Sequence, residues 1–517
     1  MTTRTYQAPE TVPSGGAPTA RWLALAVLCV SLLMVSLDNL VLNVALPTLV
    51  RDLRATTTEL QWIVDSYVIV FAGLLLVAGS IADRVGRKRV FIAGLAAFTA
   101  GSTWAAFSGS VGLLIAARAS MGIGGAMMMP STLAIITNMF RDGGERQRAI
   151  GIWSATTGAG IALGPIVGGL LLSRFWWGSV FLINVPVAVL GGALALRLVP
   201  ESRNPEAVAP DFPGALLSIA GLGLLLWSLI EAPARGWTSP LVLAAGGGGL
   251  AVLALFTAWE RHSSHPMLDL RFFRNRRFSA AVASVGLVMF GLFGALFVLT
   301  QYLQFSLGYS ALQAGLHVLP AAGAIAVVAP LSTILVRVAG TKVTAGAGLL
   351  AISGGLWQIS TASTTTTFTG ILAGLILLGV GAGLAIPAAT ASVMGAVPAD
   401  HVGVGSAANG TFLQLGGALG VAIIGSLLNT RYQGTMSGAL APYHLPHGVL
   451  EPVLGSVGGA LGVAGQLGGL VGAELGRLAR TAFASGMDLG LATGAAVAVA
   501  GMVIALLALP SRESKSR

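Results

Sequence analysis

Long uncharged stretches dominate this chain and constrain its fold more than any other feature. Only 9% of the 517 residues are Asp, Glu, Lys or Arg, whereas soluble domains average about 25%. A soluble chain of this length would divide into several domains with polar surfaces, and 19 acids with 29 bases cannot cover them. The 71 glycines would destabilise soluble helices, but small residues let membrane helices pack closely. The composition therefore excludes a soluble multidomain enzyme, a disordered chain and a disulfide-stapled protein, and it predicts a polytopic membrane protein.

Fourteen apolar runs are each long enough to cross a bilayer, which takes about 20 helical residues. We expect an all-α polytopic membrane protein with both termini on the inside. The first run is too long for the core of a signal peptide and carries Asp38, so we expect it to be retained. The runs lie at 22–47, 60–82, 90–108, 111–137, 148–172, 177–199, 213–231, 241–259, 278–306, 311–338, 343–361, 368–396, 402–429 and 482–509.

The positive charge of the chain fits the same topology. A net charge of +10 suits a nucleic-acid partner as well, so the position of the bases has to decide. With odd-numbered runs leaving the inside, most bases fall in inside loops and tails, as the positive-inside rule requires. The bases placed outside are Arg51, Arg54, Arg174, Arg235, Arg431, Arg477 and Arg480, and Arg118 alone lies within a run. We interpret the basicity as a topology signal and expect no nucleic-acid partner.

The two halves of the chain share short patterns at matching spacing. Parallel repeats of this kind place a substrate path between two helix bundles. Residues of the fourth and fifth runs recur in the twelfth and thirteenth: Gly122, Gly124, Pro130, Gly151, Ser154, Ala155, Gly164 and Gly168 correspond to Gly379, Gly381, Pro387, Gly403, Ser406, Ala407, Gly416 and Gly420.

These repeats predict six spans, an inserted pair and six further spans. We expect a disordered inside tail over 1–21, an N-terminal six-helix bundle over 22–199, a linker with two inserted helices over 200–277, a C-terminal six-helix bundle over 278–509 with a long outside loop at 430–481, and an inside tail over 510–517.

A short inside loop between the second and third runs carries the most specific motif. Gly86 suits a left-handed turn after a helix end, and Asp83 can bond a helix N-terminus or an arginine. A plain positive-inside cluster is the simpler alternative, but it explains neither this acid nor the glycines on both sides of it. The motif reads Gly79-Ser-Ile-Ala-Asp83-Arg84-Val-Gly86-Arg87-Lys88-Arg89.

This loop closely resembles the signature loop of the major facilitator superfamily, and three further motifs resemble those of its fourteen-span drug:proton antiporters. The first run departs from the antiporter pattern at Asn39, where Thr or Ser is more common, and the fourth has Met121 in place of a frequent Gln. The motifs are Leu37-Asp38-Asn39-Leu-Val-Leu-Asn43-Val-Ala-Leu-Pro47, Arg118-Ala-Ser-Met121-Gly122-Ile-Gly124-Gly125-Ala126 and Gly160-Ile-Ala-Leu-Gly164-Pro165-Ile-Val-Gly168-Gly169. The resemblance implies a major facilitator fold of two six-helix bundles plus two inserted helices.

Glycines recur every four residues in the fifth run, at 160, 164 and 168, and form one bare stripe on its helix. Such a stripe permits close packing against a facing helix. Pro165 removes one backbone hydrogen bond and permits a bend. Ordinary helix packing accounts for the stripe, and the resemblance implies in addition that this interface blocks proton leak and favours export.

Acids inside apolar runs are costly and mark functional paths. At 1.5 Å per residue, Asp38 lies about 14 Å from the outer end of its run, Asp65 about 7 Å from the start of its run and Arg118 about 10 Å into its run. All three fall in the outer half, so we expect them to form a proton-coupling and substrate site. Asp65 as a helix-start acid and Arg118 as a snorkelling side chain are the alternatives. Asp488, at the start of the last run, is expected to cap it.

No other chemistry has a plausible motif in the chain. The six histidines form no metal-ligand pattern, Cys29 is the only cysteine, and no ATP-binding loop or nucleophile motif appears. We expect no catalytic residue, no metal and no cofactor, and therefore a chain that is not an enzyme.

The sequence, together with the resemblance, predicts a proton-coupled exporter of hydrophobic or cationic drugs in the cytoplasmic membrane. Protonation of Asp38, assisted by Asp65 and Arg118, is expected to release substrate outward, while the loop around Asp83 controls closure on the inside. Expected partners are the small-molecule substrate, protons and the lipid bilayer, with the monomer as the functional unit. Export of a single antibiotic or metabolite is the main alternative, and proton-coupled uptake is a weaker one.

Overall fold

The structure is a computed structural model that describes residues 18–204, 209–263, 266–397, 402–442 and 446–510. All secondary structure in these residues is helical. Residues 1–17 and 511–517 of the two expected tails lie outside the described residues. Residues 18–21, expected to belong to the disordered tail, instead form the first turn of α1.

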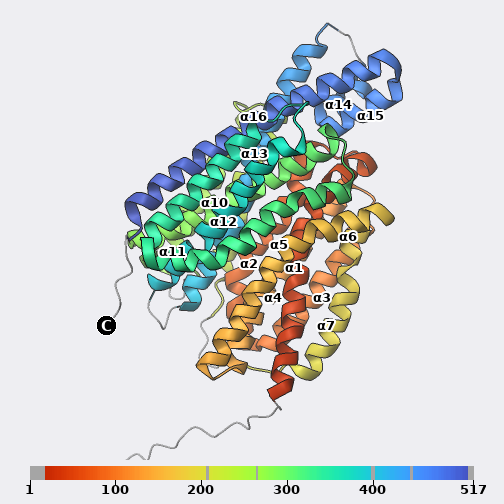
Figure 1. Ribbon diagram of the computed structural model, residues 1–517. Coiled ribbons are helices and arrows are strands. Elements are labelled where there is room, and N and C mark those ends of the chain that lie inside the picture. The colour runs from red at the N-terminus through yellow and green to blue at the C-terminus, as the bar shows by residue number, and fades with distance from the viewer. Residues whose placement is uncertain (1–17, 205–208, 264–265, 398–401, 443–445, 511–517) are drawn as a thin grey trace, which may run out of the picture.

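In the described residues, the first half of the chain and the inserted pair form helices and no strands (Figure 1). The first half contains α1 (Pro18–Leu53), α2 (Thr57–Val85), α3 (Arg87–Ala106), α4 (Val111–Met139), α5 (Gly143–Arg174), α6 (Ser179–Leu182) and α7 (Asn184–Leu198). The inserted pair consists of α8 (Phe212–Arg235) and α9 (Pro240–His262), followed by the 3-10 helix η1 (Leu270–Arg274).

The second half adds longer helices and a π-helical turn, η2 (Tyr302–Ser306), directly after the helix that begins it. Its helices are α10 (Arg276–Gln301), α11 (Ala311–Ser360), α12 (Phe368–Gly395), α13 (Val402–Leu440), α14 (His447–Gly455), α15 (Val457–Leu467) and α16 (Gly469–Ala508).

Eleven helices of the described residues are long and apolar enough to cross a membrane, so the expected count of fourteen is not confirmed. Two expected runs lie in the single helix α11, which is interrupted by non-helical backbone at Gly340 (φ 86°). The helices α3 and α5 fall outside the eleven. Three basic residues and many small or hydroxylated ones make α3 less apolar than its neighbours.

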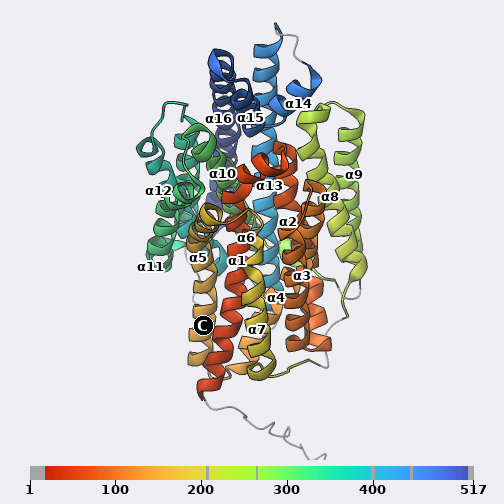
Figure 2. The same ribbon diagram turned by 90° about the vertical axis from the view of Figure 1, so that its right-hand side faces the viewer.

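The segment 430–481, expected to be a long outside loop, is largely helical. Residues up to Leu440 continue α13, α14 and α15 follow, and α16 begins at Gly469. The joint before α16 has positive φ at Gly468 (60°) and Gly469 (57°), which glycine tolerates best. With 39 and 40 residues, α13 and α16 are each about 60 Å long. Both therefore extend beyond a hydrocarbon core of about 30 Å. Figure 2 shows α14 and α15 at one end of the molecule, which we call the α14–α15 end, and we call the opposite end the Gly86 end.

The two halves use the same helix pairings. In the first, α1 packs on α5 and α3 packs on α4; in the second, α10 packs on α13 and α11 packs on α12. The inserted helix α8 packs on α2 of the first half and on α13 of the second, while α9 packs on α8 at the outer edge of the molecule (Figure 2). The inserted pair thus covers one seam between the halves.

Hydrogen bonds between the two halves lie toward the α14–α15 end. The Gln61 amide of α2 donates to the carbonyls of Val421 (3.0 Å) and Ala422 (2.9 Å) on α13. The Gln304 amide of η2 donates to the Val44 carbonyl of α1 at 3.0 Å. These contacts hold the halves together at this end of the molecule.

Close backbone contact inside the second half depends on glycine. At Gly416 on α13, an added Cβ would overlap the carbonyl of Gly286 on α10, and at Gly420 it would overlap the carbonyl of Phe290. The bare backbones let α10 and α13 approach closely, as small residues do in membrane bundles.

Replacing Gly416 by alanine is expected to lower the thermal unfolding midpoint of the purified protein, because overpacking of this kind costs about 1–3 kcal/mol. The matched control is Gly434→Ala on the same helix, where a Cβ meets open space. There, the smaller entropy of the unfolded chain should stabilise the protein by about 0.4–1 kcal/mol. Size-exclusion chromatography of heated, detergent-solubilised protein gives both midpoints, and equal midpoints would contradict the packing argument.

Candidate functional site

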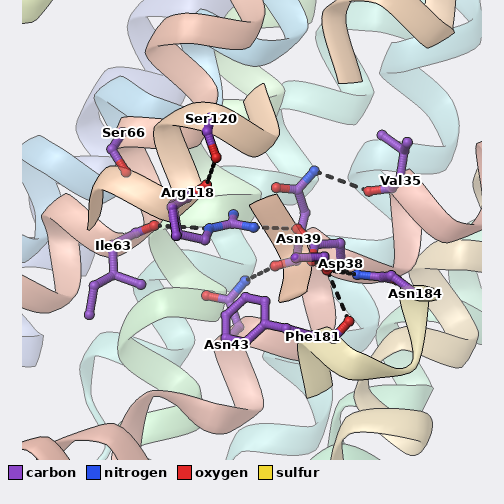
Figure 3. Close-up of polar contacts among 12 residues, drawn as sticks. Val35, Asp38, Asn39, Asn43, Ile63, Ser66, Arg118, Ser120, Phe181 and Asn184 are labelled. Atoms are coloured by element: carbon purple, nitrogen blue, oxygen red, sulfur yellow. Dashed lines mark hydrogen bonds and ion pairs between the residues drawn. The ribbon is translucent and has the colours of Figure 1, made fainter. Parts of the chain in front are cut away.

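A buried ion pair joins α1 and α4 in the middle of the first half. Nη1 of Arg118 donates to Oδ2 of Asp38, and the side chains of both residues are almost fully buried, with 0% and 2% of each residue exposed. The guanidinium also donates through Nε to the Ile63 carbonyl of α2 at 3.2 Å (Figure 3). Its Cζ lies 4.5 Å from the ring centroid of Tyr67, a cation–π contact. Through these contacts, Arg118 of α4 links its own helix to α1 and to α2.

Glycines on α4 bring the neighbouring helices within reach of this arginine. A Cβ at Gly122 would lie 2.6 Å from the Tyr67 carbonyl oxygen, and a Cβ at Gly124 would lie 2.5 Å from the Phe98 backbone nitrogen. Only bare backbone allows α2 and α3 to approach α4 so closely. The glycines that follow Arg118 in the sequence thus explain how its side chain reaches a carbonyl of α2.

The other oxygen of the Asp38 carboxylate faces a polar chain that sequence reasoning missed. Nδ2 of Asn184, at the start of α7, donates to Oδ1 of Asp38 (3.3 Å) and to Oγ of Ser102 on α3 (2.9 Å). The Ser102 hydroxyl donates to the Phe181 carbonyl of α6 at 2.9 Å. The available signal was an asparagine inside an otherwise apolar run, because a buried amide needs hydrogen-bond partners.

Asp65 on α2 does not join the ion pair. It is fully buried, and neither of its carboxylate oxygens has a hydrogen-bond partner among the described residues. One helical turn earlier, Gln61 faces α13, and residues four apart share a helix face. The structure therefore brings Asp38 and Arg118 together and leaves the Asp65 carboxyl as a separate, unpartnered buried acid.

The loop between α2 and α3 has the expected turn. Gly86 has φ 130°, a backbone conformation that favours glycine. Oδ1 of Asp83 accepts from Nε of Arg87 at 2.8 Å, and Nη1 of Arg87 donates to the Ala134 carbonyl of α4 at 3.4 Å. Arg84 is exposed, and Gly79 lies against Pro130 of α4.

The start of the linker after α7 is fastened onto this loop, a contact that the sequence did not suggest. The Asn204 backbone N–H donates to the Asp83 carbonyl at 2.7 Å, and the Arg87 N–H donates to the Ser202 carbonyl at 2.9 Å. The Glu201 carboxylate accepts from the Lys88 N–H at 3.1 Å. The linker to the inserted pair is therefore docked on the signature loop.

The glycine stripe of α5 packs on α1, as the spacing predicted. Added Cβ atoms at Gly160 and Gly164 would lie 2.5 Å and 2.6 Å from the Cβ atoms of Ser36 and Leu40, and Gly168 faces Val41.

The end of the same motif contacts the second half. A Cβ at Gly169 would lie 2.6 Å from the Leu312 Cα of α11, and the Pro165 carbonyl lies beside Gly315. The motif therefore contacts both the helix that carries Asp38 and the opposite half.

The expectation that Asp488 caps a helix is wrong. Because α16 begins at Gly469, Asp488 lies in the middle of a continuous helix, where its side chain is exposed. The described residues contain no group of three His, Cys, Asp or Glu side chains that could hold a metal ion.

Comparison with known proteins identifies the family. The model of the Major Facilitator Superfamily matches residues 28–421. The chain is 36% identical to the multidrug efflux pump LfrA of Mycolicibacterium smegmatis over 478 residues, which cover 91% of this chain and 92% of LfrA. It is 33% identical to the tetracenomycin C resistance and export protein of Streptomyces glaucescens over 516 residues, covering 98% and 95%.

The fold is similar to that of a solved transporter. The inward-facing, unoccupied bacterial homologue of the human lysosomal transporter Spinster superposes with a TM-score of 0.66 at 16% identity, covering 97% of this chain and 100% of that one. The family match and the transporter fold together indicate a multi-pass membrane transporter rather than an enzyme. The chain belongs to the Major Facilitator Superfamily.

Proposed function

We propose that this transporter exports hydrophobic or cationic drugs in exchange for protons. The buried Asp38–Arg118 pair carries the proposal, because a single carboxylate in an apolar bundle can be neutralised by an arginine, a proton or an organic cation. Relatives named as multidrug efflux and antibiotic resistance proteins support drugs as the substrate class.

In this mechanism, proton and drug compete for the same carboxylate. Ionised Asp38 balances Arg118 or binds a cationic drug, and protonation removes the negative charge and releases the drug outward. Asp65 supplies a second buried carboxyl on the neighbouring helix. Uptake in place of export is disfavoured by the α5 motif, whose implied role is to favour export and prevent proton leak.

We also propose that the chain crosses the cytoplasmic membrane fourteen times as a monomer, with both termini inside and bundles at 22–199 and 278–509. The 50 residues of α11 would extend about 75 Å as one helix, more than twice the hydrocarbon thickness. The break at Gly340 lies between Arg337 and Lys342, as expected for an inside turn. Counting α11 as two crossings and including α3 and α5 supports fourteen.

Replacing Asp38 by asparagine is expected to abolish drug-driven proton release from energised everted vesicles, because the amide cannot exchange a proton. A quaternary-ammonium dye such as ethidium serves as the drug, and a pH-sensitive fluorophore reports the proton. The matched control is Asp488→Asn, an exposed acid on α16 outside the site, which should behave as wild type. No proton release in wild-type vesicles, or wild-type release from the Asp38 variant, would refute the antiport mechanism.

Dedicated export of one antibiotic or metabolite is the second candidate, because a relative aligned over 98% of this chain is named for tetracenomycin C. A broad exporter should raise the growth tolerance of an efflux-deficient host to chemically unrelated dyes, biguanides and antibiotics, severalfold for each. Protection against one compound class alone, by a pump that is expressed and active, would favour the dedicated exporter.

We propose that the loop containing Asp83, Gly86, Arg87 and Lys88 controls closure at the Gly86 end. Its hydrogen bonds reach α4 and the linker to the inserted pair, so a change in the loop affects several helices at once.

Replacing Gly86 by alanine is expected to slow dye export severalfold at equal protein level. The positive φ costs a residue with a Cβ roughly 1–3 kcal/mol, and the Cβ would lie 2.8 Å from Oε1 of Glu201. The matched control is Gly109→Ala in the loop between α3 and α4, where a Cβ meets nothing within 4 Å. Dye export per unit of membrane protein measures the effect, and equal rates for the two variants would exclude a gating role for the turn.

A further inference from the structure

Two buried acids lie at one end of the inserted pair, outside the Asp38 site. Asp211 directly precedes α8 and is 6% exposed, and Glu260 lies in the last turn of α9 and is 3% exposed. Both fall outside the apolar runs 213–231 and 241–259, at the end of the inserted pair that points toward the Gly86 end (Figure 2). The proposed antiport uses neither of them.

The two carboxyl groups face each other across the first turn of α8. A Cβ added at Gly214 would lie 2.8 Å from Oδ2 of Asp211 and 2.8 Å from Oε1 of Glu260, so only bare backbone leaves room for both oxygens. Oε1 of Glu260 has no hydrogen-bond donor among the described residues, although almost the whole residue is buried. An ionised carboxylate has no hydrogen to give, so two facing carboxyl oxygens bond each other only if one of them holds a proton.

The other carboxyl oxygens have donors that fix both groups in place. The Gly214 N–H donates to Oδ1 of Asp211 at 2.9 Å, and the indole nitrogen of Trp259 lies 3.0 Å from both Asp211 oxygens. The Leu268 N–H donates to Oε2 of Glu260 at 3.0 Å. Asp211 thus keeps two donors as a carboxylate, and Oε1 of Glu260 is the oxygen left to carry a proton.

The neighbouring charges at this end leave the two acids without a counter-charge in the described residues. The helix α13 carries no charged residue before Arg431. Burial raises the pKa of Glu260 to about 7, the Leu268 N–H lowers it, and the charge of Asp211 raises it. The charged side chains of α2, α9 and η1 at this end are exposed or bonded elsewhere: Arg84, Arg261, His262 and Arg274 are exposed, Asp83 bonds Arg87, and Asp269 bonds Arg271.

We propose that Asp211 and Glu260 share one proton and form a proton-binding site that is separate from Asp38. The proton is bonded to Oε1 of Glu260 and donated to Oδ2 of Asp211, and its loss to water leaves two carboxylates face to face. Two carboxylates in one buried site disfavour double ionisation, and such pairs hold a proton for that reason. A metal ion is a poorer occupant, because the described residues supply no third carboxylate, histidine or cysteine.

The shared proton joins segments that lead to both halves of the chain. Asp211 follows the linker that is docked on the signature loop, and Leu268 leads through η1 into α10. While the proton is bound, Glu260 holds the start of α8, the end of α9 and Leu268 together. Release of the proton sets two like charges against each other, so the inserted pair loosens at this end as the pH on that side rises.

Trp259 reports the charge of the two acids in the purified full-length protein, because its indole N–H faces both Asp211 oxygens. The fluorescence component that is absent in Trp259→Phe should titrate in wild type with a midpoint of about pH 7. Asp211→Asn and Glu260→Gln each put an amide hydrogen in place of the shared proton, and each should remove this titration. Glu451→Gln changes an exposed acid on α14 and is the matched control, which should titrate as wild type.

Thermal unfolding provides a second readout. Because the pKa of Glu260 is higher in the folded than in the unfolded chain, this group should cost wild type stability as the pH rises from about 5 to about 7, with no further loss above that. Below about pH 5, Glu260→Gln should match wild type, and above about pH 7 its unfolding midpoint should be higher by a few degrees.

A wild-type titration in either amide variant, or no titration of the Trp259 component between about pH 5 and about pH 9, would refute the shared proton. Stabilisation of wild type, but of neither variant, by Ca²⁺ or Mg²⁺ at about pH 8 would identify a cation site and refute it as well. Ethidium-driven proton release from everted vesicles tests the proposed antiport separately, so either proposal can fail while the other stands.

Discussion

The buried contact between Asp38 and Arg118 is the constraint on which the arrangement of the first half depends. Removing two charges from water is costly unless each keeps partners of good geometry. Arg118 obtains them from α1 and α2 as well as from the Tyr67 ring, and Asp38 obtains its second from α7. Four helices, α1, α2, α4 and α7, must therefore hold their relative positions, and Gly122 and Gly125 of α4 let α2 approach closely enough. A change of charge at Asp38 therefore alters contacts that join α1, α2, α4 and α7.

The parts of the site that the sequence predicted are those with strong local signals. An acid and an arginine inside apolar runs stand out because hydrocarbon tolerates few charges, and Gly86 and the α5 stripe have characteristic spacing. Asn184, Ser102 and the linker contacts of Glu201 could not be predicted in this way. Asn184 bonds a residue 146 positions away, and one asparagine or serine in an apolar run is compatible with many partners.

The helices α14 and α15 within the segment 430–481 were not predicted, for a different reason. We expected a loop in this segment, which is rich in Gly, Ala and Leu. Alanine and leucine nevertheless favour helix, and tertiary contacts decide whether the helices form. The Tyr432 hydroxyl of α13 donates to the Val453 carbonyl of α14 at 2.7 Å, and α15 packs on α16 and α1. These contacts join residues of different helices, so they cannot be predicted from the local sequence. The expected cap at Asp488 failed for the same reason, since α16 starts well before the apolar run.

The inserted helix α8 lies against both α2 and α13, whereas α5 and α11 meet directly on another face of the molecule. The two junctions between the halves are therefore unequal as seen from the surrounding lipid. The first junction is covered by a helix, whereas at the second α5 and α11 meet without an inserted helix, through a contact that includes Gly169 and Pro165 of α5. The insertion breaks the equivalence of the two junctions, which two symmetric bundles alone would share.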